Sequence, residues 1–418
     1  MEFHKQTLDN GLTILAECNP SALSAAVGFF VRTGSRDEDD AAAGVSHFLE
    51  HMVFKGTPTR SADDVNREFD ELGAYYNAYT SEENTVFYAA VLPEYLDQVV
   101  ALLADIMRPS LREEDFEMEK QVILEEIFMY EDQPPFGADE KARAAFWAGH
   151  PLEKSVLGTT ETIGALSADR MRDYFRRRYA PGNIILAATG AVDFDDLTHL
   201  AGAFCGDWEP LEADRAIRPA AAHMGFHLVQ KEIAAQQYSL LLSEAPFAED
   251  RDRYAAKLLG TVLGDDTGSR LYWELIETGL ADHAGMSHAE FEGAAMFLTT
   301  MSCAPESAAE NLTRIGRLFR KAASDGIAPR ELAQAKNKVR SRLVLGSELP
   351  RNRIFGLGLE WSVRRRYMSL EEELDALESI QLDHLHAVLA EFPPAESLVM
   401  TVGPLETMET PGEWTPLS

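Results

Sequence analysis

The stretch that decides the fold is GVSHFLEHMVFKGT, residues 44–57. It places His47 and His51 four residues apart, with Glu50 between them. Residues four apart on a helix share one face and are separated by about 6 Å along its axis, so both imidazoles can reach one ion. Two interpretations are open at this point. The stretch forms a metal site, or it is an amphipathic helix whose polar residues face solvent.

The order of the three polar residues is compatible with catalytic chemistry at a metal. Neutral imidazole is a good zinc ligand, and a catalytic zinc keeps three protein ligands and a water. The ion lowers the pKa of that water toward ~7, and a nearby carboxylate can take its proton. HxxEH is the inverted form of the HExxH signature. In that interpretation His47 and His51 are ligands and Glu50 is the general base.

A third ligand has to come from another segment. The segment EMEKQVILEEI, residues 117–127, offers Glu119, Glu125 and Glu126. Glu119 and Glu126 are seven residues apart and share one helix face. A carboxylate in such an apolar run is costly to bury unless it is paired or bound to a cation. The alternative for these glutamates is a solvated helix edge.

Composition limits the class of protein. The chain has 418 residues, is 45% hydrophobic and 26% charged, and carries a net charge of −31, which is ordinary for a globular protein and argues against nucleic acid as a partner. The three cysteines are far apart and form no CxxC pair, so we expect no disulfide framework. We see no signal peptide and no apolar run long enough to cross a bilayer, and predict a cytoplasmic location with no membrane partner.

Local patterns predict mixed strands and helices. A hairpin with a DNG turn is predicted for HKQTLDNGLTILAE, residues 4–17. The segment SADDVNREFDELGA, residues 61–74, reads as a helix with a serine start and a glycine stop. Two strands are predicted in YYNAYTSEENTVFYAAVL, residues 75–92.

The chain also repeats itself. The layout of residues 159–192 returns in residues 368–405, and residues 111–127 are echoed by residues 327–345, both with an offset of about 210. We therefore predict two homologous α+β domains, residues 1–215 and 222–418, each with a mainly antiparallel sheet and packed helices. The second half has no HxxEH, and its equivalent helix carries Lys and Arg where the first carries Glu.

Three stretches together resemble a known family. GSRDE with GVSHFLEHMVFKGT, then ELGAYYNAYTSEENTVFYAAVL, then EKQVILEEIFMYEDQP, are similar to the M16 (pitrilysin-like, inverzincin) metallopeptidases. Within them the chain resembles the branch of mitochondrial processing peptidase and its bacterial relatives. The resemblance covers nearly the whole chain. It is highly specific in the first half and weaker in the second.

This resemblance implies roles for individual residues. It implies one zinc ion per chain, held by His47, His51 and Glu126, with Glu50 as general base. Glu119 matches a family acid that supports the site without binding the metal. Asn77 and Ala78, in NAYTS, match an edge strand that holds an extended substrate by strand addition; the alternative for Asn77 is a turn or strand-end residue.

The resemblance also implies an assembly in which two subunits close like a clamshell around peptides or unfolded segments. One match fails: the Arg and Tyr that contact substrate in the second half of single-type members fall on Ile276 and Asp282, after the matching run Ser269–Tyr272. This indicates a zinc endopeptidase that is the catalytic subunit of a heteromer, with a homologous subunit supplying the pair. The alternative is a non-catalytic core or assembly subunit of a larger complex.

Overall fold

The computed structural model of the chain describes residues 1–132, 137–211 and 213–414. These residues form two compact units, each built from segments of both halves of the sequence. Unit 1 comprises Met1–Phe128, Lys154–Ala216 and Val344–Met368. Unit 2 comprises Met129–Glu153, Ile217–Leu343 and Ser369–Ser418.

Unit 1 contains a six-stranded mixed sheet with the order β1-β2-β6-β3-β5-β4. Only the β2–β6 pair is parallel among the pairs formed by these strands, and the predicted hairpin is the antiparallel β1–β2 pair. The strands are β1 (Glu2–Thr7), β2 (Thr13–Cys18), β3 (Ala25–Val31), β4 (Tyr75–Thr80), β5 (Thr85–Val91) and β6 (Ile184–Gly190). Strand β3 is buried along its whole length, as expected for the centre of a sheet covered on both faces.

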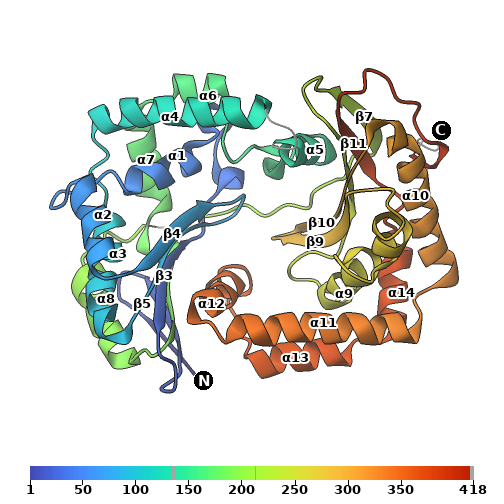
Figure 1. Cartoon of the computed structure of the whole chain (residues 1–418). Helices are drawn as coiled ribbons and strands as arrows, with labels where there is room; N and C mark the ends of the chain where they lie inside the picture. Colours follow the sequence, from blue (N-terminus) through green and yellow to red (C-terminus); the bar gives the residue numbers. More distant parts are fainter. Residues whose placement is uncertain (133–136, 212, 415–418) are drawn as a thin grey trace. The chain divides into compact units, whose positions relative to one another are not determined.

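Helices cover both faces of this sheet (Figure 1). The helices of unit 1 are α1 (Val45–Val53), α2 (Ala62–Glu71), α3 (Leu96–Ile106), α4 (Glu113–Asp132, whose last residues fall in unit 2), α6 (Thr160–Ala165), α7 (Ala168–Arg178), α8 (Phe194–Cys205) and α12 (Pro350–Arg364). The serine start predicted for α2 is confirmed, because the Ser61 hydroxyl accepts a hydrogen bond from the Asp64 amide at 3.2 Å.

Unit 2 repeats this plan with a five-stranded mixed sheet of order β7-β11-β8-β10-β9. The strands are β7 (Gly225–Gln230), β8 (Gln237–Glu244), β9 (His283–Phe291), β10 (Ala294–Cys303) and β11 (Leu398–Gly403). The helices are α5 (Ala138–Phe146), α9 (Arg253–Gly264), a π-helix (Tyr272–Ile276), α10 (Ala308–Asp325), α11 (Pro329–Ser347, whose last residues fall in unit 1), α13 (Leu370–Ser379) and α14 (Leu382–Glu391). The predicted α+β class is confirmed in both units.

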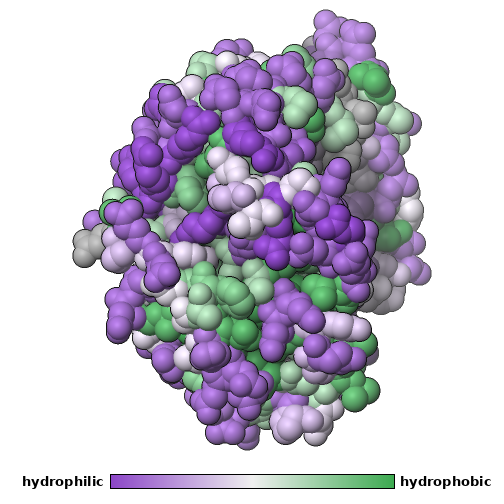
Figure 2. All heavy atoms as spheres, turned by 90° about the vertical axis from the view of Figure 1, so that its left-hand side faces the viewer, coloured by the Kyte–Doolittle hydropathy of each residue, from purple (hydrophilic) through white to green (hydrophobic). Residues whose placement is uncertain are grey.

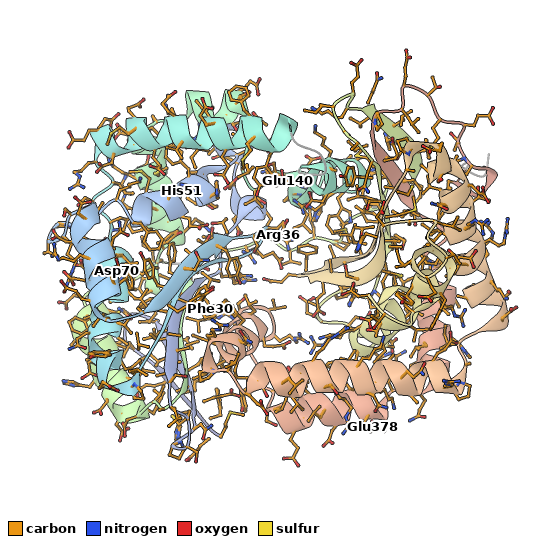
Figure 3. All side chains as sticks on the ribbon, in the orientation of Figure 1. Phe30, Arg36, His51, Asp70, Glu140 and Glu378 are labelled. Atoms are coloured by element: carbon orange, nitrogen blue, oxygen red, sulfur yellow. The ribbon has the colours of Figure 1, made fainter. Side chains whose placement is uncertain are left out.

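Each sheet receives one helix from the other half of the sequence. In unit 1, Ile354, Leu357 and Trp361 of α12 pack into the core of a sheet whose strands all come from residues 2–190. The contact is close: a Cβ on Gly358 would lie 2.5 Å from the Phe30 ring, which Figure 3 labels on the sheet of unit 1. In unit 2, α5 packs in the same way against β8 and β11. The domain limits of 1–215 and 222–418 stay a prediction.

The surface reflects the composition. Figure 2 shows that hydrophilic side chains cover most of the visible face, with hydrophobic side chains between them. This agrees with the net charge of −31, since most of these charges face solvent.

Candidate metal centre

Helix α1, which carries the HxxEH stretch, is fixed by packing at one face. Phe48 of α1 stacks on Phe116 of α4, with ring centroids 4.7 Å apart and an interplanar angle of 13°. Both rings are fully buried. A stacked aromatic pair of this kind stabilises beyond its buried area, and it sets the register of α1 against α4. The histidines of α1 are thereby held next to the glutamates of α4, as the position of the labelled His51 beneath α4 illustrates (Figure 3).

A buried carboxyl group holds the start of α1. Glu38 accepts hydrogen bonds from the backbone amides of Gly44 and Ser46, each at 2.7 Å. These are amides that a helix cannot satisfy by itself. Burial raises the pKa of Glu38 to about 8, although both amides favour its ionised form. The hydroxyl of Ser46 in turn lies 2.7 Å from that of Tyr174, which lies 2.8 Å from Thr33 Oγ1.

The structure brings His47, His51 and Glu126 together, with one possible ligand atom of each within 4.8 Å of the others. The Nε2 atoms of His47 and His51 both lie 3.8 Å from Glu126 Oε2. Two ligand atoms of a tetrahedral zinc site, with bonds of about 2.0–2.1 Å, are separated by about 3.4 Å. The three donors are therefore nearly at zinc-binding separation. No second group of three such ligands occurs among residues 1–132, 137–211 and 213–414.

The charge state of His47 suits a metal ligand. Burial, with a smaller contribution from the nearby His51, lowers the pKa of His47 to about 3. Its imidazole is therefore neutral near pH 7, with a lone pair available. The two imidazole rings lie 4.7 Å apart at an angle of 69°, so they approach one point from different directions. These donors fit a zinc ion.

Glu119 lies behind His51 and not among the converging donors. Its Oε1 is 2.8 Å from His51 Nδ1, and its Oε2 is 2.5 Å from Lys55 Nζ. Burial raises the pKa of Glu119, but the hydrogen bonds from His51 and Lys55 outweigh this and the net shift is downward. For His51 burial lowers the pKa, and the hydrogen bond and charge of Glu119 reverse this to a net rise. Glu119 thus orients the ring so that Nε2 faces Glu126.

Glu50 faces the sheet, where β4 ends. Thr80, the last residue of β4, donates a hydrogen bond to Glu50 Oε2 at 2.6 Å. Burial raises the pKa of Glu50, while the Thr80 hydrogen bond partly opposes the shift. Asn77 and Ala78 lie three and two residues before Thr80 on the same edge strand; the Asn77 side chain is exposed and its Oδ1 accepts from the Ala78 amide at 2.9 Å.

Two residues of this site carry no assignment in the sequence analysis. Thr80 stands within the NAYTS stretch, and Glu38 ends the GSRDE stretch. Both stretches belong to the segments that resemble the M16 family, but their local sequence does not reveal a contact with α1. Thr80 meets Glu50 across 30 residues of chain, and Glu38 reaches Ser46 only because a loop turns back at Gly44.

The second half presents no Arg or Tyr at the two positions where the resemblance leads one to expect them. Ile276, at the end of the π-helix, packs against the core of unit 2. Asp282 precedes β9 and accepts a hydrogen bond from Gln236 Nε2 at 2.6 Å. Arg270, in the matching run, is engaged with Glu331 at 2.7 Å and with a backbone carbonyl.

Comparisons with known proteins show the family to which the chain belongs. Residues 13–160 match the model of the insulinase family (peptidase family M16), and residues 165–339 match the model of the peptidase M16 inactive domain. A protein of Mycobacterium tuberculosis named an uncharacterized zinc protease is 33% identical over 92% of this chain and 89% of its own length. One of the same description from Rickettsia felis is 30% identical over 92% of this chain and 93% of its length. The chain belongs to peptidase family M16, a family of zinc metallopeptidases.

Solved structures show the same fold. A protease from Helicobacter pylori has a TM-score of 0.88 at 21% identity, covering 96% of this chain and 99% of that one. A chain of the complex III dimer of Candida albicans has a TM-score of 0.85 at 18% identity, covering 98% of each. At these identities the likeness concerns the fold alone. Within the described part of the chain, every helix is too short or too polar to span a bilayer.

Proposed function

We propose that this chain is a zinc-dependent endopeptidase of the processing-peptidase branch and the catalytic subunit of a heteromer. The observation that carries the proposal is the convergence of His47, His51 and Glu126, with Glu50 beside them and hydrogen-bonded to Thr80. We infer one zinc ion per chain, held by the first three residues. A scaffold protein has no need to keep two histidine side chains and a half-buried carboxylate together in this arrangement.

The chain's own residues suit peptide hydrolysis. Zinc at this site would supply a water of lowered pKa. Glu50 is the group placed to accept a proton from the attacking water and to pass it to the amine that leaves. Its hydrogen bond from Thr80 engages Oε2 and leaves Oε1 for that proton. Glu119 holds the His51 ring in one orientation throughout.

The substrate is a peptide in extended form. Strand β4 is the last strand of its sheet, so one edge of its backbone is free to pair with another strand. Asn77 and Ala78 lie in the middle of this edge, and Thr80 at its end carries the contact to Glu50. A peptide added to β4 would therefore run past the general base. This geometry favours unfolded segments over folded proteins.

The assembly proposal rests on Ile276 and Asp282. Hydrolysis builds negative charge on the former carbonyl oxygen, and a positioned donor there is worth roughly 10²–10³-fold in rate. Ile276 has no donor, and the side chain of Asp282 faces Gln236. A homologous subunit that keeps an Arg and a Tyr would supply the donors. The chain assayed alone should then be weakly active on unstructured peptides, and adding that subunit should restore activity unless its Arg or Tyr is replaced.

The experiment that tests the activity is Glu50→Gln. It should keep zinc, because Glu50 is not among the converging donors, and should lower peptide cleavage by roughly 10²–10⁴-fold, as expected for the loss of a general base. Glu125→Gln, on the same helix as Glu126, is the control and should change neither quantity. The competing function, a non-catalytic core subunit, requires that the purified chain hold no zinc and cleave nothing.

A further inference from the structure

A second site lies in unit 2, at the position that the duplication makes equivalent to the metal centre. It is a cavity of about 390 Å³ lined by α9, β9, β10 and α11. Its lining includes Lys257, Gly260 and Thr261 of α9 and Arg342 of α11. Each of these four residues occupies the position equivalent to one residue of the metal centre. The equivalence follows from the alignment of α9 with α1 and of α11 with α4 by their buried positions.

Helix α9 aligns with α1 at an offset of 210 residues. Six positions are buried in both helices, namely Val45, Ser46, Phe48, Leu49, Met52 and Val53 in α1 and Ala255, Ala256, Leu258, Leu259, Val262 and Leu263 in α9. The burial differs at two positions, because Lys257 is exposed where His47 is buried and Gly260 is buried where Glu50 is partly buried. In this alignment Lys257 replaces His47, Gly260 replaces Glu50 and Thr261 replaces His51. All three line the cavity, as their counterparts line the metal centre.

Helix α11 matches α4 in the same way. The buried positions Leu332, Ala335 and Val339 of α11 correspond to Phe116, Glu119 and Ile123 of α4. Arg342 then falls on the position of Glu126, the third metal donor. The general base and all three metal ligands are therefore absent from this copy, and two of the four positions carry a cation instead.

Glycine at position 260 leaves room in this cavity. Gly264 lets α9 approach β9 closely, since a Cβ there would lie 2.2 Å from the Met286 amide nitrogen. At Gly260 a Cβ would meet its nearest atom, the Met286 carbonyl oxygen, only at 3.6 Å. The space that Glu50 fills in α1 is thus open in α9, with Lys257 and Arg342 on its walls.

The charge around this space suits one negative group. Asp265 accepts from Lys338 Nζ and from Arg342, both at 2.5 Å. Asp266 also lines the cavity and is exposed. Lys257 has no ion-pair partner in the part of the chain that the structure describes. The lining itself holds two cations, Lys257 and Arg342, and two carboxylates, Asp265 and Asp266. Lys338 does not line the cavity but pairs with Asp265, so this group of five side chains carries one surplus positive charge in a chain whose net charge is −31.

We propose that this cavity binds one carboxylate of a peptide, either a C-terminal carboxylate or an acidic side chain, with Lys257 and Arg342 as its charge partners. A single surplus charge fits a monoanion, and Asp266 disfavours ligands of higher charge such as polyphosphates. The identity of the carrier as a peptide rests on the proposed function. Within that function the cavity selects substrates by a carboxylate that lies outside the segment being cleaved.

The test measures peptide binding, not cleavage. The full chain carrying Glu50→Gln is loaded with zinc, and its affinity is measured by fluorescence anisotropy for three forms of one peptide. The first has a free C-terminus, the second is C-terminally amidated with no acidic residue, and the third is amidated with one glutamate. We expect the second peptide to bind roughly 3- to 10-fold more weakly than the first or the third. This is the contribution to affinity expected from one partly exposed ion pair. Whichever carboxylate form binds more tightly identifies the source.

Variants then locate the effect. Lys257→Ala should remove the preference for a carboxylate, and Lys257→Glu should reverse it, while both leave the affinity of the amidated peptide unchanged. Lys321→Ala, an exposed lysine on α10, is the matched control and should keep the preference. Because Lys257 is exposed and unpaired, these variants should fold like the parent.

These measurements decide whether the cavity binds a peptide carboxylate. Equal affinity for all three peptides, or equal effects of Lys257→Ala and Lys321→Ala, would overturn the inference even if the native chain cleaves peptides normally. A carboxylate preference that depends on Lys257 would support it even if no cleavage were found, and in that case the proposed function alone would fail.

Discussion

The hydroxyl of Thr80 donates a hydrogen bond to Glu50 Oε2 at 2.6 Å, and so joins the edge strand β4 to the helix that carries both histidines. A glutamate side chain has three rotatable bonds. If its orientation is not fixed, catalysis is less efficient, because misplacement by about 1 Å can lower the rate 10²-fold. Thr80 removes part of that freedom. It also links the strand proposed to bind the substrate to the proposed general base.

Replacing Thr80 with Val should therefore lower kcat by roughly 10- to 100-fold, because the isosteric side chain leaves Glu50 undirected. KM and zinc content should change little, since Val keeps the strand and removes no ligand. Thr80→Ser restores the hydroxyl and should recover most of kcat. Steady-state kinetics with metal analysis checks this, and equal kcat for the Val and Ser variants would contradict it.

Zinc binding should depend on Glu126 and not on its neighbour Glu125. Glu126 Oε2 lies 3.8 Å from both imidazoles, whereas the side chain of Glu125 is exposed. We expect about one zinc per chain, lost in His47→Ala and His51→Ala, weakened in Glu126→Gln and retained in Glu125→Gln. Elemental analysis after dialysis measures it. Loss of zinc from Glu125→Gln with retention in Glu126→Gln would reverse the choice of ligand.

Glu119→Gln should weaken zinc binding by roughly 10- to 100-fold without abolishing it. The amide can still accept from His51 Nδ1, but it no longer carries the charge that makes the ring a better donor and that pairs with Lys55. Competition with a fluorescent chelator gives the affinity. Glu114→Gln, an exposed position on the same helix, should leave the affinity unchanged. A complete loss of zinc would instead make Glu119 a ligand.

Glu38 should make the stability of the protein fall as pH rises. Its folded-state pKa is about 8, above the ordinary value of 4.5. The folded protein therefore keeps a proton that the unfolded chain releases between these values. The stabilising contribution is complete below about pH 4.5 and is lost as pH rises toward 8, by at most about 1.4 kcal/mol per pH unit.

This pH dependence can be isolated by comparison with Glu38→Gln, which does not titrate. Urea unfolding of the metal-free proteins at pH 5 and at pH 8 gives the free energy of unfolding of each. The difference between parent and variant should favour the parent more at pH 5 than at pH 8. The opposite trend would mean that the amides of Gly44 and Ser46 hold Glu38 ionised in the folded state.

The packing of α12 on the first sheet predicts opposite effects for two glycines of one helix. Gly358→Ala would place a methyl group 2.5 Å from the buried Phe30 ring and should cost roughly 1–3 kcal/mol of unfolding free energy. At Gly356 the nearest atom to an added Cβ is the end of the Arg353 side chain at 3.4 Å, so Gly356→Ala should be neutral or stabilise by up to about 1 kcal/mol. Thermal or urea unfolding checks both. Equal effects would contradict the close contact.

Residues near one another in the chain made several features predictable. His47 and His51 share a helix face because they are four apart. The hairpin at the N-terminus and the serine cap of α2 follow from turn and capping preferences that act over a few residues. The duplication is visible because both halves keep the same order of helices and strands, and with it the contrast between Glu126 in α4 and the cations of α11.

Other features depend on segments that meet only when the chain folds. No local rule pairs Thr80 with Glu50 or sends Glu38 to the start of α1, because side-chain hydrogen bonds between distant segments depend on the register of whole elements. Helical spacing gave Glu119 and Glu126 the same face, but only the packing of α4 on α1 turned one toward His51 Nδ1 and the other toward both Nε2 atoms. The exchange of α5 and α12 between the two sheets is of the same kind. An amphipathic helix records in its sequence that one face must be buried, and it does not record which sheet will bury it.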